Sequence, residues 1–254
     1  MHGLFGTKHI ILIAASLLLF AIGYVFSRKL SFRVITRLML YVGICSELIK
    51  VFYYIVQNED THGGVLPKTD LPFHLCSIQI IFILILNLSK NERIHELLIS
   101  FMMPSCLIGG LAAILIATDS SRNGMWIITL QYFVYHAAIM VYALYLATSK
   151  EHKPTVKGYF SCLKLLLSLM FFAVYINSML YDGVSNINFM YVSGPPQPGL
   201  PYLNDDRGWL SYILRYAFLV LACVTLFYLK PILRAIFKRP NESYLECEEE
   251  LMIR

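Results

Sequence analysis

Residues 97–117 have the sequence LLISFMMPSCLIGGLAAILIA, which contains no charged side chain. A helix needs about 20 largely apolar residues to cross the hydrocarbon core of a bilayer, so this run is long enough to span a membrane. Six other segments are of the same kind. Together they predict an all-α membrane protein, a seven-transmembrane-helix bundle with spans at residues 8–26, 34–56, 71–89, 97–117, 124–147, 160–181 and 209–230.

The composition agrees with this architecture. The chain has 254 residues, of which 57% are hydrophobic and 15% are charged, whereas a soluble domain carries about 25% charged residues. These values exclude a disordered chain, a disulfide scaffold and an ordinary cytosolic enzyme. The spans leave little sequence for a soluble domain, so we expect one membrane domain over residues 1–230 and a charged cytoplasmic tail over residues 231–254.

Basic residues are distributed unevenly between the two sides of the predicted bundle. The connections after the first, third and fifth spans, together with the tail, hold 15 of the 21 Lys and Arg residues. Because cytoplasmic loops are enriched in basic residues, this asymmetry predicts an N-terminus outside the cell and a C-terminus in the cytoplasm. We expect the bundle to lie in the cell membrane, as a bacterial plasma-membrane protein. Four basic residues fall on the outer side: Lys8, Lys68, Arg122 and Arg207.

The positions of the basic residues also indicate which partners to expect. Most lie within a few residues of a span end, where long basic side chains reach lipid head groups. We therefore expect membrane lipid as the partner and no nucleic acid. The six cysteines lie almost entirely in or beside spans and form no CxxC pattern. This spacing predicts neither a disulfide framework nor a metal site, and we expect no cofactor.

Polar residues within the spans are the candidates for function, because a charged side chain at the bilayer centre costs at least roughly 2.5–3.5 kcal/mol on insertion scales. Most of them lie in the outer half of their helices. This distribution predicts a polar cavity open toward the outer face and argues against a continuous transport path, which needs polar residues at every depth. The candidate pocket residues are Glu47, Lys50, Gln79, Gln131, Tyr135, Asn177 and Arg215, and the candidate catalytic residues are Cys76, His136 and His74.

The sharpest local motif is LPFHLC at residues 71–76, which opens the third span. Pro72 suits the first turn of a helix, because its missing N–H would have no partner there. In a regular helix His74 points about 200° away from Cys76. A catalytic Cys76 would then take its base from His136 on the fifth span, unless the first turn is distorted. The structural alternatives are a small packing residue at Cys76 and a histidine bonded to a neighbouring carbonyl at His74.

Three charged residues lie within the predicted spans. Glu47 and Lys50 are spaced i,i+3 and are expected to form an ion pair on one helix face. Alternatively, Glu47 meets Arg215 or a histidine across the bundle. Arg215 is otherwise a candidate to hold a lipid phosphate or carboxylate, which arginine binds through two parallel hydrogen bonds.

Two further segments are predicted to have structural roles. The connection at residues 182–208 is the longest and is rich in Asn, Gly, Pro and apolar residues. A loop of this length is usually functional or mobile, and its apolar residues lead us to expect a folded lid over the mouth of the bundle. Small residues spaced by four in the fourth span predict close helix packing. They are Ser105, Gly109, Ala113 and Ala117.

The runs LPFHLCSIQI, MPSCLIGGLAA, QYFVYHAAIM and NINFMYVSGPP, taken in order, resemble the YwaF-type integral membrane proteins. That family includes the animal transmembrane protein 164 branch, and the likeness covers about residues 34–230. The resemblance implies a seven-span fold. From the animal branch it also implies phospholipid acyl transfer through a cysteine acyl intermediate, with Cys76 in the position of the nucleophile and His74 or His136 as the base. The animal branch has adjacent Cys-His at the corresponding helix start, whereas this chain has His-Leu-Cys.

Two hypotheses for the function follow. In the first, the chain is an acyltransferase or acyl hydrolase acting on lipid, in which Cys76 attacks the ester and His136 moves the proton. In the second, it is a non-enzymatic transporter or ligand-binding membrane protein that uses Glu47, His136 and Arg215 for a proton-linked or anionic ligand. The apolar inner half of the spans favours the first hypothesis.

Overall fold

The computed structural model describes residues 4–57, 64–149, 152–204 and 206–237. Most of the predicted cytoplasmic tail, from residue 238 onward, lies outside these residues. In the described part of the chain every regular element is a helix, which confirms the all-α class. The helices are α1 (Thr7–Ser27), α2 (Phe32–Gln57), η2 (Lys68–Asp70), α3 (Leu75–Leu88), α4 (Glu92–Leu115), α5 (Asp119–Asn123), α6 (Trp126–Thr148), α7 (Val156–Leu180), η3 (Phe189–Tyr191), α8 (Trp209–Phe227) and α9 (Leu229–Phe237).

Six of these helices are long and apolar enough to cross a membrane: α1, α2, α4, α6, α7 and α8. The seventh predicted span, residues 71–89, contains α3, a helix of 14 residues. At 1.5 Å per residue α3 is about 21 Å long, which is less than the hydrocarbon thickness of about 30 Å. The structure therefore shows a multi-pass helical membrane protein with six helices of spanning length in its described part, and the seven-span count and the orientation stay predictions.

The third predicted span is short because its first residues do not join the helix. Pro72 restrains the residue before it, and the chain turns so that Phe73 N–H donates to the carbonyl of Leu71 at 2.8 Å. His74 has an extended backbone, with φ −69° and ψ 150°, and forms the N-cap of α3. The prediction that Pro72 lies in the first helical turn was wrong. The helical angle of about 200° between His74 and Cys76 does not apply either, because His74 lies outside the helix.

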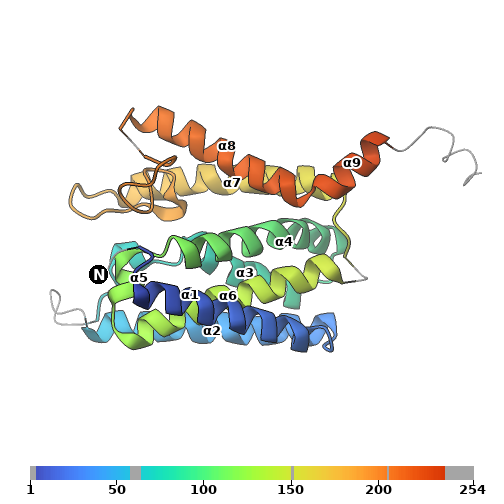
Figure 1. Ribbon diagram of the computed structural model, residues 1–254, viewed down its shortest axis with the longest axis horizontal. Helices are drawn as coiled ribbons and strands as arrows, with labels where there is room; N and C mark the ends of the chain where they lie inside the picture. Colours follow the sequence, from blue (N-terminus) through green and yellow to red (C-terminus); the bar gives the residue numbers. More distant parts are fainter. Residues whose placement is uncertain (1–3, 58–63, 150–151, 205, 238–254) are drawn as a thin grey trace, which may run out of the picture.

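Helices α4 and α6 form the centre of the bundle. In their most apolar stretches 56% and 61% of the residues are buried, compared with 11% for each of α1, α7 and α8. Figure 1 shows α4 in the middle of the molecule, with α7 and α8 as a layer on one side and α1, α2 and α6 on the other. Helix α3 packs against both α2 and α4, so the LPFHLC motif begins beside the buried centre of the bundle.

A glycine permits the close approach of the two central helices. A Cβ atom at Gly110 would lie 2.7 Å from Cγ of Met140 and 3.0 Å from the carbonyl oxygen of His136. At Gly109 the same atom would meet only Cδ2 of Leu75, at an ordinary 3.8 Å. The predicted stripe of small residues contained Gly109, whereas the position that is sterically required is Gly110, which faces α6.

The connection between α7 and α8 is folded, as predicted for the lid. Residues Phe189, Met190 and Val192 in this segment are buried. Met190 and Val192 pack in one apolar cluster with Ile78 of α3 and Ala173 of α7. Figure 1 places the connection at one end of the bundle. We call residues 182–208 the lid.

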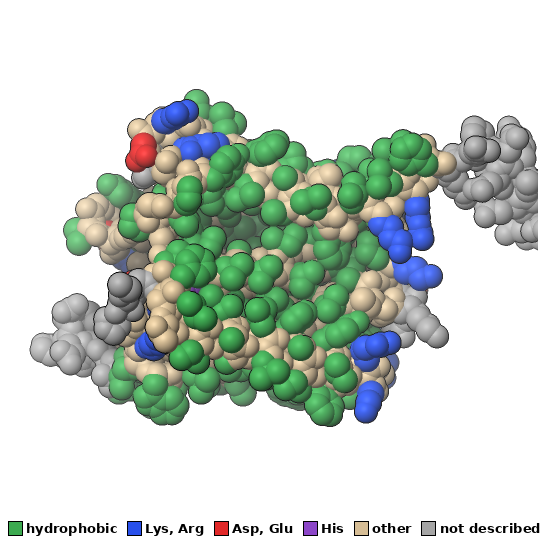
Figure 2. Space-filling model, in the orientation of Figure 1, with side chains coloured by type: hydrophobic (Ala, Val, Ile, Leu, Met, Phe, Trp, Pro, Cys, Tyr) green, Lys and Arg blue, Asp and Glu red, His purple; other side chains and the backbone are tan. Residues whose placement is uncertain are grey.

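Figure 2 shows several basic side chains at the end of the molecule that carries α9, which is opposite the lid. The turn between α1 and α2 and helix α9 both contribute basic residues to the sequence there. The faces between the two ends are largely apolar side chains in the same view. This distribution is the one that a bundle immersed in lipid requires.

Candidate functional site

The predicted site residues fall into two groups in the structure. One group surrounds the start of α3 and the other fastens the lid. Within the first group, Nζ of Lys50 lies 2.8 Å from Oε2 of Glu47, which confirms the predicted i,i+3 ion pair. Ser77, which directly follows Cys76, also donates its hydroxyl to Oε1 of Glu47 at 2.5 Å. The carboxylate of Glu47 therefore links α2 to the first turn of α3.

Cys76 is a free, half-buried cysteine in the first turn of α3. The hydroxyl of Tyr135 on α6 donates to the backbone carbonyl of Cys76 at 2.8 Å. The charged groups of Glu47 and Lys50 are close enough to the thiol to interact with it electrostatically. The backbone N–H and the hydroxyl of Ser77, the next residue, also interact with the Cys76 sulfur.

His74 lies between α3 and the lid. Its ring centroid is 5.1 Å from that of Phe189 and 5.6 Å from that of Tyr191. It is also within electrostatic reach of Lys50 and His136. Because its backbone is extended, its side chain is not confined to the helix face opposite Cys76.

His136 is buried on α6, and one of its two ring nitrogens is hydrogen-bonded to the backbone. Nδ1 lies 2.7 Å from the backbone oxygen of Tyr132, and the two rings pack with centroids 4.2 Å apart. A carbonyl oxygen can only accept a hydrogen bond, so Nδ1 must carry the proton. In the neutral ring Nε2 is then the unprotonated nitrogen. The ring of Tyr135 is also near, with its centroid 5.8 Å from that of His136.

The two predicted glutamines connect helices. Gln131 donates to Oγ of Ser46 at 2.5 Å, which joins α6 to α2. Gln79 is fully buried and donates to Oγ of Ser105 at 2.9 Å, which joins α3 to α4. The side-chain oxygen of Gln79 has no partner among the described residues. These contacts give both glutamines a structural role around the start of α3.

Asn177 belongs to the second group, because its side chain forms hydrogen bonds with the lid. Its amide accepts from the N–H of Phe189 at 2.9 Å, and donates to the carbonyl of Phe189 at 3.3 Å and to Oγ of Ser193 at 3.1 Å. Met190 and Tyr191 both have φ of 55°, which costs of order 1–3 kcal/mol for a residue other than glycine. Asn177 therefore holds a strained segment that places Tyr191 against His74.

Two tyrosines on α8 hold the same strained segment. The hydroxyl of Tyr212 donates to the carbonyls of Tyr191 and Gly194, at 2.5 and 2.7 Å. The hydroxyl of Tyr216 donates to the carbonyl of Met190 at 3.0 Å. The lid is thus fixed by α7 on one side and by α8 on the other.

Arg215 fastens the far end of the lid. Its guanidinium donates to the carbonyls of Tyr202 and Asn204, at 2.7 and 2.5 Å, and to Oδ1 of Asn204 at 2.9 Å, while Nε donates to Ser211 within α8. The carboxylate of Glu47 is instead paired with Lys50. Arg215 is therefore occupied by protein acceptors, so we assign it to holding the lid in place.

Two aspartates outside the spans lie at the rim of this region. Burial raises the pKa of Asp70, which is also close to Lys50 and Glu47. Asp182, at the start of the lid, accepts from Nζ of Lys68 at 2.8 Å. This contact and the N–H groups of Ser185 and Val184 hold the pKa of Asp182 well below its ordinary value. The Lys68–Asp182 pair ties the segment before α3 to the lid.

The structure adds residues that sequence reasoning did not single out. Ser77, Tyr132 and Tyr191 each contact a candidate catalytic or pocket residue, through a hydrogen bond or a ring contact. A serine beside a cysteine and two more tyrosines in a chain that has 17 of them carry no distinguishing sequence signal. In the described part of the chain, no cluster of three or more His, Cys, Asp or Glu side chains could hold a metal ion. An apolar depression on α1, lined by Ala21, Ile22, Val25 and Phe26, lies away from these residues.

A family model described as the TMEM164 family matches residues 4–228, which is most of the chain. No curated protein and no solved structure matches the chain.

Proposed function

The chain belongs to the TMEM164 family, and from that premise we propose that it is a membrane acyltransferase or acyl hydrolase that acts on phospholipid through Cys76. The proposal places this chemistry in the outer half of a bacterial plasma membrane. The feature that carries it is the state of His136. The Nδ1–H of His136 is committed to the carbonyl of Tyr132, so Nε2 is left as a proton acceptor in a buried site beside the start of α3.

The proposed reaction has two steps. In the first, Sγ of Cys76 attacks the ester carbonyl carbon of a phospholipid, and the thiol proton passes to Nε2 of His136. The tetrahedral intermediate then expels the glycerol oxygen of the lysolipid, which takes that proton, and an acyl thioester remains on Cys76. In the second step, the hydroxyl of an acceptor lipid or of water attacks the thioester. Its proton passes through His136 to the departing thiolate, which restores the free cysteine.

The other residues of the first group have supporting roles in this proposal. The ammonium of Lys50 lies close enough to Cys76 to interact with the negative charge that develops on sulfur during the attack. Tyr135 holds the backbone of Cys76 and so positions the sulfur. His74 and Tyr191 lie on the lid side and are proposed to line the path of the acyl ester, with His74 as the alternative base.

The test is direct trapping of the acyl enzyme. The full chain in detergent is incubated with phosphatidylcholine that carries a labelled acyl group, and the label bound to protein is measured before and after neutral hydroxylamine. We expect label on wild-type protein that hydroxylamine releases, the same on Cys45→Ala, and none on Cys76→Ala. Full activity of Cys76→Ala would refute the mechanism. His136→Asn and His74→Asn then identify the base, because only the loss of the base removes the rising limb of activity with pH.

A transporter or ligand-binding protein is the second candidate. It would use the charges of Glu47 and His136 without a covalent intermediate. The Glu47 carboxylate, however, is already neutralised by Lys50 and bonded to Ser77. Beyond the first turns of α3 the buried residues, such as Ile83 and Leu86, are apolar. Proteoliposome uptake that Glu47→Gln abolishes, with no acyl label on Cys76, would favour this second function instead.

A further inference from the structure

Arg122 is a buried cation with too few acceptors. It lies on the five-residue helix α5, between the C-terminal end of α4 and the N-terminal end of α6, and is only 5% exposed. Its Nη2 lies 3.3 Å from Oδ1 of Asp119, and this is its one ion pair in the described part of the chain. Its Nε and Nη1 are buried and have no partner among the described residues.

This arrangement is costly unless another group is present. A guanidinium has five N–H donors, and removing it from water without acceptors carries a penalty of several kcal/mol. The Asp119 side chain is 80% exposed, and its Oδ1 also accepts from Asn123 at 2.7 Å. Because exposed carboxylates are well solvated, this single long contact offsets little of the cost.

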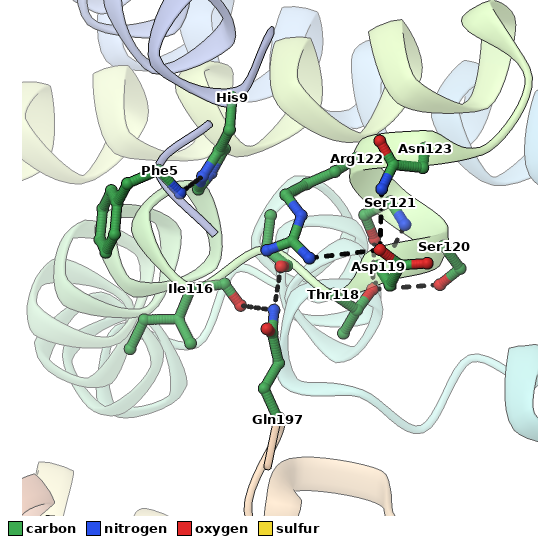
Figure 3. Close-up of polar contacts among 11 residues, drawn as sticks. Phe5, His9, Ile116, Thr118, Asp119, Ser120, Ser121, Arg122, Asn123 and Gln197 are labelled. Carbon is green, nitrogen blue, oxygen red and sulfur yellow. Dashed lines mark hydrogen bonds and ion pairs between the residues drawn. The ribbon is translucent and has the colours of Figure 1, made fainter. Parts of the chain in front are cut away.

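The backbone acceptors around Arg122 are already engaged. The carbonyl of Ile114 is bound by Nε2 of His9 at 2.9 Å. The carbonyls of Ile116 and Ala117 both accept from Nε2 of Gln197, which belongs to the lid. Figure 3 shows Arg122 between the N-terminal segment that carries His9 and the lid residue Gln197. Three distant segments of the chain thus meet around a guanidinium that none of them satisfies.

We propose that Arg122 is a binding site for a phosphate group, carried by a lipid head group or by free phosphate. Such a ligand supplies the negative charge and the acceptor oxygens that Nε and Nη1 lack, and arginine is well suited to bind it. The hydroxyls of Thr118, Ser120 and Ser121, which form a hydrogen-bonded cluster in the same turn, are further donors at the site. Since Gln197 of the lid docks beside the guanidinium, opening of this lid contact admits the ligand. The site does not depend on the proposed chemistry at Cys76.

The experiment measures binding to the full chain in detergent with two kinds of probe. The first is inorganic phosphate, compared with chloride at equal ionic strength. The second is phosphatidic acid in mixed micelles, compared with diacylglycerol of the same chains, which lacks only the phosphate. The apparent Kd is obtained from the ligand-dependent rise in melting temperature. A response to phosphatidic acid alone identifies a head-group site, and a response to both identifies a site for phosphate as such.

The variants make the assignment specific to Arg122. We expect Arg122→Gln and Arg122→Lys to weaken binding at least tenfold. Arg207→Gln removes the same charge from an exposed position of the lid and is expected to bind as the wild type does. Arg122→Lys keeps a cation in place, so it answers the question if Arg122→Gln fails to fold. If neither probe shifts the wild-type protein, or if both Arg122 variants bind as tightly as Arg207→Gln, the proposal is wrong.

Discussion

The hydroxyl of Tyr135 on α6 donates to the backbone carbonyl of Cys76 on α3 at 2.8 Å. The bond fixes the first turn of a short helix against the buried centre of the bundle. It does so through the backbone carbonyl and does not involve the thiol. Tyr135 can therefore position Cys76 from another helix.

Tyr135→Phe should change the reactivity of Cys76 toward maleimide while lowering the stability of the fold only slightly. The loss of one hydrogen bond between buried groups costs about 0.5–1.5 kcal/mol. Tyr142→Phe is the matched control. Tyr142 lies on α6, as Tyr135 does, but its hydroxyl bonds Thr36 of α2 at 3.0 Å and does not contact Cys76. We expect both variants to lose similar stability on heating, and only Tyr135→Phe to change the rate at which maleimide labels Cys76. Equal labelling rates in the two variants would show that Tyr135 does not position Cys76.

Asn177→Ala should release the strained part of the lid. The substitution leaves the buried N–H and carbonyl of Phe189 without their partners, at about 1–3 kcal/mol for each unsatisfied group. Met190 and Tyr191 can then leave their left-handed conformation. We expect hydrogen exchange of residues 187–193 to accelerate at least tenfold, as measured by mass spectrometry. Ser178→Ala, which removes a hydroxyl bonded only within α7, is the control and should leave this exchange unchanged.

The helices were largely predictable from the sequence, because lipid demands long apolar runs and internally satisfied backbone. The Glu47–Lys50 pair was also predictable, since residues three apart share a helix face. The N-terminal boundary of α3, by contrast, could not be predicted. It depends on the turn that Pro72 and Phe73 form in place of a first helical turn. The apolar content of the segment does not distinguish that turn from a helix.

The partners of Arg215 and Asn177 could not be read from their spans. Both side chains bond to backbone atoms of the lid, and a backbone carbonyl has no sequence signature. The same holds around Arg122, where His9 and Gln197, which are far apart in the sequence, bond to backbone carbonyls at the end of α4 and just after it. The sequence identified polar residues within the predicted spans, but it did not show which of them would form hydrogen bonds with other parts of the protein.

Arg215→Lys should expose the far end of the lid to protease. Lysine keeps the charge but lacks the planar group that contacts Tyr202 and Asn204 together. Arg207 is exposed in the same stretch and is a cleavage position for trypsin. We expect limited trypsin digestion to cut Arg215→Lys after residue 207 several-fold faster than the wild type. The double variant with Arg207→Gln should lose that fragment. A wild-type cleavage rate in Arg215→Lys would contradict the role of Arg215 in holding the lid.

The contributions of Asp182 and Asp70 to the stability of the folded protein should change with pH in opposite directions. The pKa of Asp182 is lowered in the folded protein, mainly by Lys68. Its stabilising contribution is therefore present above the unfolded value of about 3.9 and is lost as the pH falls through the folded value. The pKa of Asp70 is raised by burial. Its contribution is present below about 3.9 and is lost as the pH rises through its folded value.

Hydrogen exchange of residues 182–185, followed from pH 6 down to pH 3 and corrected for the intrinsic rate, tests this. We expect the wild-type protein to lose protection there at the acid end, because protonated Asp182 no longer pairs with Lys68 or attracts the N–H groups of Val184 and Ser185. Asp182→Asn should show reduced protection that no longer varies with pH. Asp70→Asn should keep the wild-type acid transition and raise protection only near pH 6, where it removes a buried charge. An acid transition that survives in Asp182→Asn would assign it to another group.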